Sequence, residues 1–167
     1  LELLAEKCKH LHPHERNFVI AFDELAIIPG NCFDPSTKMH LGNVTLPESD
    51  NQANMALVCI AMGIVKRVKQ VVACHYTDKT TNGDSMISFL SSLVCKTEEI
   101  YKINIRAFSF DMGTVNRSMI TKLGITLNLK NEVSSIKHPV RSSDELHLIC
   151  DPTHASKNLN QGFKNNG

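Results

Sequence analysis

The sequence lacks any CxxC pair, although it contains six cysteines. Structural zinc sites and disulfide frameworks usually show closely spaced cysteine pairs, so the spacing argues against both. Four of the six lie inside apolar runs, where free thiols commonly pack, and this favours a reducing compartment. The cysteines are Cys8, Cys32, Cys59, Cys74, Cys95 and Cys150.

Long hydrophobic runs are also missing. No apolar stretch approaches the ~18 residues that a membrane-spanning helix needs, and no basic-then-apolar leader opens the chain. We therefore expect a soluble, intracellular protein with no membrane partner.

An excess of either charge is absent, because 18 Lys and Arg face 17 Asp and Glu. The net charge therefore does not indicate a nucleic-acid partner, although a chain with this net charge can still carry a local basic strip. No repeat, low-complexity segment or linker divides the 167 residues, of which 42% are hydrophobic and 21% charged. This composition is typical of one globular α/β domain.

Periodicity predicts the order of the elements. Helices are expected over residues 1–10, 86–100, 114–123 and 152–159, and strands over 18–28, 56–63, 70–76, 103–111 and 146–151. A weaker run at 39–46 is interpreted as an edge strand. Residues 56–76 read as a hairpin with a basic tip, which is either a solvated turn or a contact with the DNA backbone. The tip carries Lys66, Arg67 and Lys69.

Three of these strands carry an aspartate, which is the main chemical feature of the sequence. Asp23 interrupts the first strand, while Asp111 and Asp151 each end a later strand. The carboxyl ends of neighbouring parallel strands line one crevice, so Asp23 and Asp111 should converge if their strands are neighbours. An aspartate at a strand end also commonly caps the next helix, and this alternative applies to Asp111 and Asp151.

Asp23 caps nothing, because strand residues continue after it. We interpret it as a buried acid, whose desolvation a bound metal ion would offset. Paired carboxylates suit Mg²⁺ or Mn²⁺, which prefer oxygen ligands. Glu24 points to the opposite face of the strand and is expected to be solvated or paired.

Four segments, in this order and spacing, resemble the P-element-type transposases and their THAP-type domesticated relatives. The segments are FDEL at 22–25, ALVCIAMGIVKRVKQVVACHYTD at 56–78, FSFDMGTVN at 108–116 and DPTHASKNLNQGF at 151–163. The resemblance implies the amino-terminal part of an RNase H-like catalytic domain. It assigns metal-binding, catalytic roles to Asp23 and Asp111.

In that family the third acid is a Glu beyond an inserted domain that binds guanine nucleotide, and the chain contains neither. The resemblance implies GTP binding in the full-length protein, with Asp151, His154 and Lys157 close to the nucleotide. The chain departs from the family pattern at Thr153 and Ala155, which weakens the link to the nucleotide. The family's amino-terminal zinc-coordinating DNA-binding domain is not present in these residues.

Rival interpretations stay open. Gly83-Asp84-Ser85 and Asp151-Pro152-Thr153-His154 match the GDS and DxxH motifs of certain serine hydrolases, but Ser85 follows a polar turn and is typical of a helix cap. A domesticated or decayed transposase would instead be a non-catalytic module that binds DNA or protein. A nucleotide- or methyl-donor-binding domain needs a glycine-rich loop, and Asp111-Met112-Gly113 supplies one glycine.

The sequence is therefore predicted to form an RNase H-like α/β fold with a mixed five-stranded sheet, helices on both sides and an incomplete carboxyl terminus. Residues 1–16 form a leading helix and loop, and 151–167 begin a connection to an insertion. Leu1 at the start and the polar end at Gly167 suggest a piece of a longer protein. The resemblance implies a nuclear, metal-dependent DNA transposase that acts on transposon ends and target DNA, with a homo-oligomer as a candidate assembly.

Overall fold

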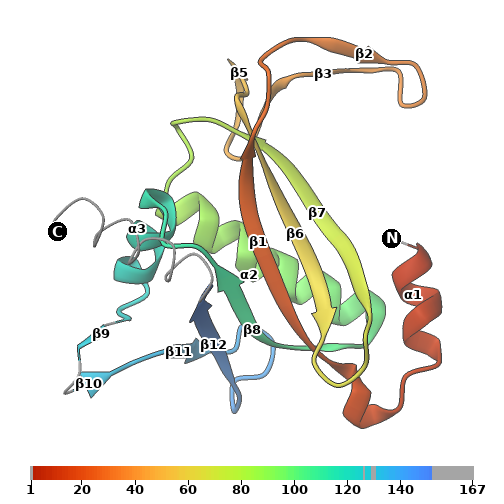
Figure 1. The fold of residues 1–167 in the computed structure, drawn as a ribbon, viewed down its shortest axis with the longest axis vertical. Helices are drawn as coiled ribbons and strands as arrows, with labels where there is room; N and C mark the ends of the chain where they lie inside the picture. The colour runs from red at the N-terminus through yellow and green to blue at the C-terminus, as the bar shows by residue number, and fades with distance from the viewer. Residues whose placement is uncertain (1, 126, 129–130, 152–167) are drawn as a thin grey trace, which may run out of the picture.

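The centre of the molecule is a mixed six-stranded sheet. The computed structural model describes residues 2–125, 127–128 and 131–151, and the sheet has the strand order β11-β12-β8-β1-β6-β7 (Figure 1). Its strands are β1 (Asn17–Ala26), β6 (Met55–Gly63), β7 (Lys69–Thr77), β8 (Asn104–Phe110), β11 (Ser135–Lys137) and β12 (Glu145–Cys150). The five predicted strands are all present. The sixth, β11, was not predicted because three residues are too short to show a periodic pattern.

Three helices cover one face of this sheet. They are α1 (Glu2–Lys9), α2 (Gly83–Tyr101) and α3 (Thr114–Lys122), with a short 3-10 turn η1 (Pro13–Arg16) before β1. The expected helix ends agree with these bounds to within a few residues. In α2 the side chain of Asn82 accepts hydrogen bonds from the backbone N–H groups of Asp84 and Ser85, which fixes where the helix begins.

The core lies between that face and the helices. Alternate residues of β1 are buried, and Phe18, Ile20 and Phe22 pack with Leu90 and Val94 of α2. This alternation is the period of two expected for a strand that is covered on one face.

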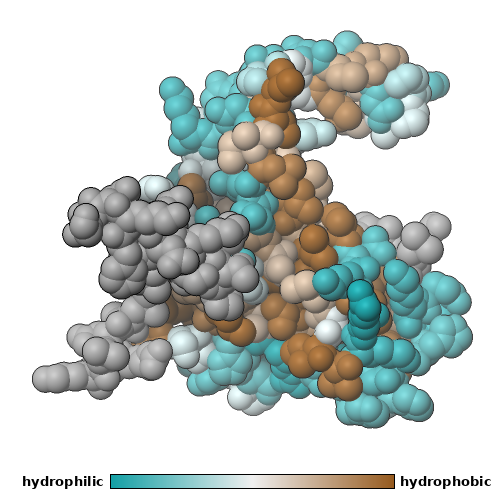
Figure 2. All heavy atoms as spheres, viewed as in Figure 1, coloured by the Kyte–Doolittle hydropathy of each residue, from teal (hydrophilic) through white to brown (hydrophobic). Residues whose placement is uncertain are grey.

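The opposite face of the sheet is not covered by any helix among the described residues. The prediction of helices on both sides is therefore not met in this part of the chain. Leu25, Val71 and Ile149 are about half exposed there, and Figure 2 shows hydrophobic atoms running along the middle of this face. None of the described helices is long and apolar enough to cross a membrane.

Residues 27–54 form an arm beyond the end of β1 (Figure 1). The arm contains two hairpins, β2 (Cys32–Asp34) with β3 (Met39–Leu41) and β4 (Asn43–Thr45) with β5 (Glu48–Gln52). The prediction of one edge strand over 39–46 is wrong. Gly42 splits that run, because its φ of 134° is a conformation that other residues rarely adopt.

A further pair of two-residue strands, β9 (Leu127–Asn128) and β10 (Asn131–Glu132), precedes β11. All six cysteines carry free thiols, with Cys8 and Cys59 buried. Burial raises the pKa of the Cys59 thiol to about 12, so this side chain behaves as a core residue rather than a nucleophile.

Candidate active site

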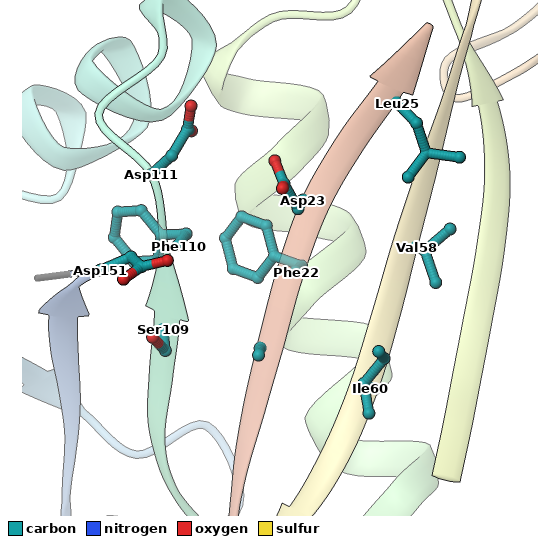
Figure 3. Close-up of a pocket in the computed structure, with 10 residues that line it drawn as sticks. Phe22, Asp23, Leu25, Val58, Ile60, Ser109, Phe110, Asp111 and Asp151 are labelled. Atoms are coloured by element: carbon teal, nitrogen blue, oxygen red, sulfur yellow. The ribbon is translucent and has the colours of Figure 1, made fainter. Parts of the chain in front are cut away.

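The three aspartates lie toward the carboxyl ends of three neighbouring parallel strands. Strands β1, β8 and β12 run parallel, with β8 in the centre. Ser109 of β8 is in register with Ala21 of β1 and Ile149 of β12. Continuing each strand by two positions gives Asp111, Asp23 and Asp151, so the three residues occupy corresponding positions on neighbouring strands, and Figure 3 shows them around one opening.

A β-bulge places two of them on the same face. The register between β1 and β8 shifts after Phe18, and Arg106 becomes the extra residue of β8. Beyond the bulge Phe108 and Phe110 face the helices, and Asp111 shares the uncovered face with Asp23. If the pairing of β1 with β8 were shifted by one residue, one of the two carboxylates would point toward the core.

The carboxylates line a common hollow of about 320 Å³ on the uncovered face. Its floor is apolar, with Ala21, Val58 and Ile60 among the lining residues. Below the carboxylates the rings of Phe22 and Phe110 stack at a centroid distance of 5.0 Å, which links the middle of β1 to the end of β8.

Asp23 is exposed, so the prediction of a buried acid is wrong. Strand alternation turns the side chain toward the uncovered face, and the pairing of β1 with β8 ends at Ala21. Asp23 therefore lies in the middle of β1 but beside the opening between β1 and β8. Its Oδ1 accepts a hydrogen bond of 2.9 Å from the backbone N–H of Glu24.

Asp111 is half-buried and is not the N-cap of α3. The N-cap is Gly113, which makes no side-chain capping bond. Asp111 Oδ1 instead accepts hydrogen bonds from the Gly113 N–H at 3.1 Å and from Asn116 Nδ2 at 2.8 Å. These bonds hold the carboxylate above the end of β8.

Asp151 is half-buried and lines the same hollow, and its backbone N–H donates to the carbonyl of Phe110 at 2.8 Å. This bond extends the pairing of β12 with β8. The other two residues predicted close to a nucleotide, His154 and Lys157, lie outside the described residues, as does the helix predicted over 152–159.

The basic residues of the hairpin tip lie far from the aspartates. The tip joins β6 to β7, and Gly63 at the end of β6 pairs with Phe18 at the start of β1. Lys66, Arg67 and Lys69 are exposed at that end of the sheet, and Lys66 Nζ lies 3.6 Å from Glu15 Oε2. The structure does not bring this tip together with the carboxylates.

Ser85 has a structural role. Its hydroxyl accepts a hydrogen bond from the backbone N–H of Asn82 and completes the cap of α2. A Ser nucleophile at this position would have to abandon that cap, and this geometry argues against the serine hydrolase interpretation.

Glu24 and Asn116 complete the surroundings of the two acids. Glu24 Oε1 accepts a hydrogen bond of 2.8 Å from Thr77 Oγ1, so it is paired as predicted. Asn116 was missed by the sequence interpretation. The sequence feature that could have identified it is its position five residues after Asp111. At this spacing a side-chain amide in the first turn of the next helix reaches back to the end of the strand.

The donor set suits a hard divalent cation, since carboxylate oxygens are the ligands that Mg²⁺ and Mn²⁺ prefer. Asp23 and Asp111 would supply two ligands. Among the described residues no group of three or more His, Cys, Asp or Glu side chains is arranged to hold a metal ion. The pair therefore fits a metal that takes its remaining ligands from water, substrate or other residues.

A family model for the TNP-like RNase H N-terminal domain matches residues 1–124. The chain belongs to this family. Residues 1–124 include β1, β8 and the first two aspartates, so the resemblance inferred from the four sequence segments is confirmed.

A solved structure supports the same fold. It is the Drosophila P element transposase strand transfer complex, which superposes with a TM-score of 0.70 at 19% sequence identity. The match covers 92% of this chain and 31% of that chain. No curated protein sequence matches the chain significantly. The RNase H-like fold is thus established, with six strands in place of the predicted five.

Proposed function

We propose that this chain is the amino-terminal part of the catalytic domain of a metal-dependent DNA transposase. The observation that carries the proposal is that Asp23 and Asp111 occupy corresponding positions on neighbouring parallel strands and line one hollow. The family membership and the likeness to a transposase fold support it.

In this mechanism Asp23 and Asp111 would hold the metal beside the end of β8. Bound Mg²⁺ or Mn²⁺ would activate water or a DNA 3′-hydroxyl for attack on a phosphodiester bond and stabilise the leaving oxygen. The exposed carboxylate of Asp23 leaves room for a DNA backbone, while the stacked rings of Phe22 and Phe110 hold β1 against the end of β8. A third acid would come from another part of the full-length protein.

The partners follow from the same proposal. We expect transposon ends and target DNA as substrates, GTP bound near Asp151 in the full-length protein, and a nuclear location. Lys66, Arg67 and Lys69 remain candidates for contacts with the DNA backbone, at the end of the sheet opposite the acids.

The test is to replace each acid in the intact protein. Asp23→Asn and Asp111→Asn should each reduce Mn²⁺-dependent DNA cleavage and strand transfer by more than about a hundredfold, because each removes a charged ligand. Circular dichroism should show an unchanged fold. Asp50→Asn is the matched control, since Asp50 is an exposed aspartate of the arm, and it should keep full activity.

Substantial cleavage by the Asp23→Asn or Asp111→Asn protein would reject the assigned roles. If the wild-type protein binds DNA but neither cleaves nor binds Mn²⁺, the chain belongs to a non-catalytic, domesticated module instead.

A further inference from the structure

Asn116 donates a hydrogen bond from the first turn of α3 to the carboxylate of Asp111. Its side chain is 9% exposed, and Nδ2 donates to Asp111 Oδ1 at 2.8 Å and to the Asp111 carbonyl at 3.2 Å. A buried amide that donates twice to one residue fixes both the backbone and the side chain of that residue.

From this geometry we propose that Asn116 is a positioning residue, which orients Asp111 for metal binding without touching the metal. The inference rests on the proposed function. Both side-chain bonds to Asp111 end on Oδ1, one from Asn116 and one from the Gly113 N–H, and no described residue donates to Oδ2. The two donors therefore set the rotamer and leave Oδ2 as the ligand oxygen.

Two neighbouring glycines allow close packing around this arrangement. Gly113 has no side chain, and a Cβ there would lie 3.2 Å from Asp111 Oδ1 and 3.4 Å from Oδ2. The helix that carries Asn116 is held by close packing, because a Cβ at Gly83 of α2 would lie 2.8 Å from Ser118 Oγ of α3. The packing of α3 against α2 thus determines the position from which the Asn116 amide donates to the Asp111 carboxylate.

An amide suits this role because it donates to a carboxylate and does not titrate near neutral pH. Partners of this kind, which hold a metal ligand from behind, typically change metal affinity by 10–100-fold when they are removed. Asn116 should therefore contribute to affinity through the orientation of Asp111.

The test measures binding of Mn²⁺ alone, from the enhancement of water proton relaxation during a titration of the protein. Asn116→Ala should weaken binding about tenfold. Thr121→Ala is the matched control, since Thr121 lies on the exposed side of the same helix and bonds to the Arg117 carbonyl; it should bind like the wild type. Asp111→Asn should remove binding.

Gly113→Ala gives a second route if Asn116→Ala does not fold. The added Cβ would lie 3.2 Å from Asp111 Oδ1 and crowd the same carboxylate, so binding should also weaken severalfold. A purely structural role for Asn116 would lower the melting temperature but leave the Mn²⁺ affinity of the folded protein unchanged.

The outcomes separate the two proposals. If Asp111→Asn removes binding while Asn116→Ala binds within twofold of the wild type, the role of Asn116 is overturned and the metal site stands. If the wild type does not bind Mn²⁺, or Asp111→Asn binds equally well, the metal site and the role of Asn116 fall together.

Discussion

At the scale of single residues, Glu98 shows how a buried charge is held in this fold. The carboxylate lies in the last turns of α2 and is 8% exposed. Oε1 accepts the Ile105 N–H at 2.7 Å and lies 3.3 Å from His138 Nε2, while Oε2 contacts Arg141 at 2.5 Å. The group joins α2, β8 and the segment before β12, so it helps to hold two of the aspartate-bearing strands.

Replacement of Glu98 should therefore be costly. Glu98→Ala leaves the Ile105 N–H without its acceptor and the Arg141 guanidinium without one of its carboxylates, and should lower the free energy of unfolding by about 3 kcal/mol. Urea denaturation measures this change. Glu99→Ala is the control, because Glu99 is exposed on the same helix, and a change within about 0.5 kcal/mol is expected. Equal effects of the two substitutions would contradict the network.

At the scale of elements, the β2–β3 hairpin depends on its turn. An isolated two-stranded hairpin is marginally stable in water. Here the carboxylate of Asp34 stabilises the turn by accepting hydrogen bonds from residues of the turn itself. Its Oδ2 accepts a hydrogen bond of 2.7 Å from the Thr37 hydroxyl, and its Oδ1 accepts hydrogen bonds from both the backbone N–H and the hydroxyl of Ser36. Led by the Thr37 bond, these contacts lower the pKa of Asp34 from 3.8 to about 2.

This shift predicts an acid-sensitive turn. Because the folded pKa is the lower one, the stabilisation is complete above pH 3.8 and is lost as the pH falls toward about 2. The amide chemical shifts of Ser36 and Thr37 should change over this range. Asp34→Asn should abolish the change at these amides, and a turn that titrates equally in that variant would exclude Asp34 as the cause.

At the scale of the whole molecule, the described helices and the core lie on one side of the sheet, and the arm extends beyond it. The described core joins β1, β6 and β8 to the three helices, and the β4–β5 hairpin is tied to β7 by hydrogen bonds between Thr45 and Tyr76. Among the described strands, the β2–β3 hairpin pairs only within itself. Exposed apolar side chains of the arm include Phe33 at 52% and Met39 at 61%. Stability should therefore be uneven, with the sheet centre opening last.

Hydrogen exchange should detect this difference. Amides of β1 and β8 should exchange on the order of a thousandfold more slowly than those of β2 and β3, because the sheet opens with the core and the hairpin opens locally. Mass spectrometry of deuterated peptides resolves the two regions. Comparable protection would show that the arm packs against another surface in solution.

Much of the fold was predictable from the sequence. Strand alternation, the capping residues before Met86 and the basic turn after Gly63 are local patterns. They predicted the main helices, the hairpin, the strand that contains Asp23 and the two strands that end beside Asp111 and Asp151. Element type depends on neighbours along the chain, and the family resemblance in four short segments rested on the same local residues.

The tertiary structure decided the relations between those segments. The sequence by itself determined that three strands carry aspartates, but only the parallel pairing of β1 with β8 and the bulge at Arg106 placed Asp23 and Asp111 on one face. It also decided that Asp23 is exposed and that Asn116 reaches Asp111. Exposure and register depend on which distant segments pack together, and periodicity along the chain does not contain that information.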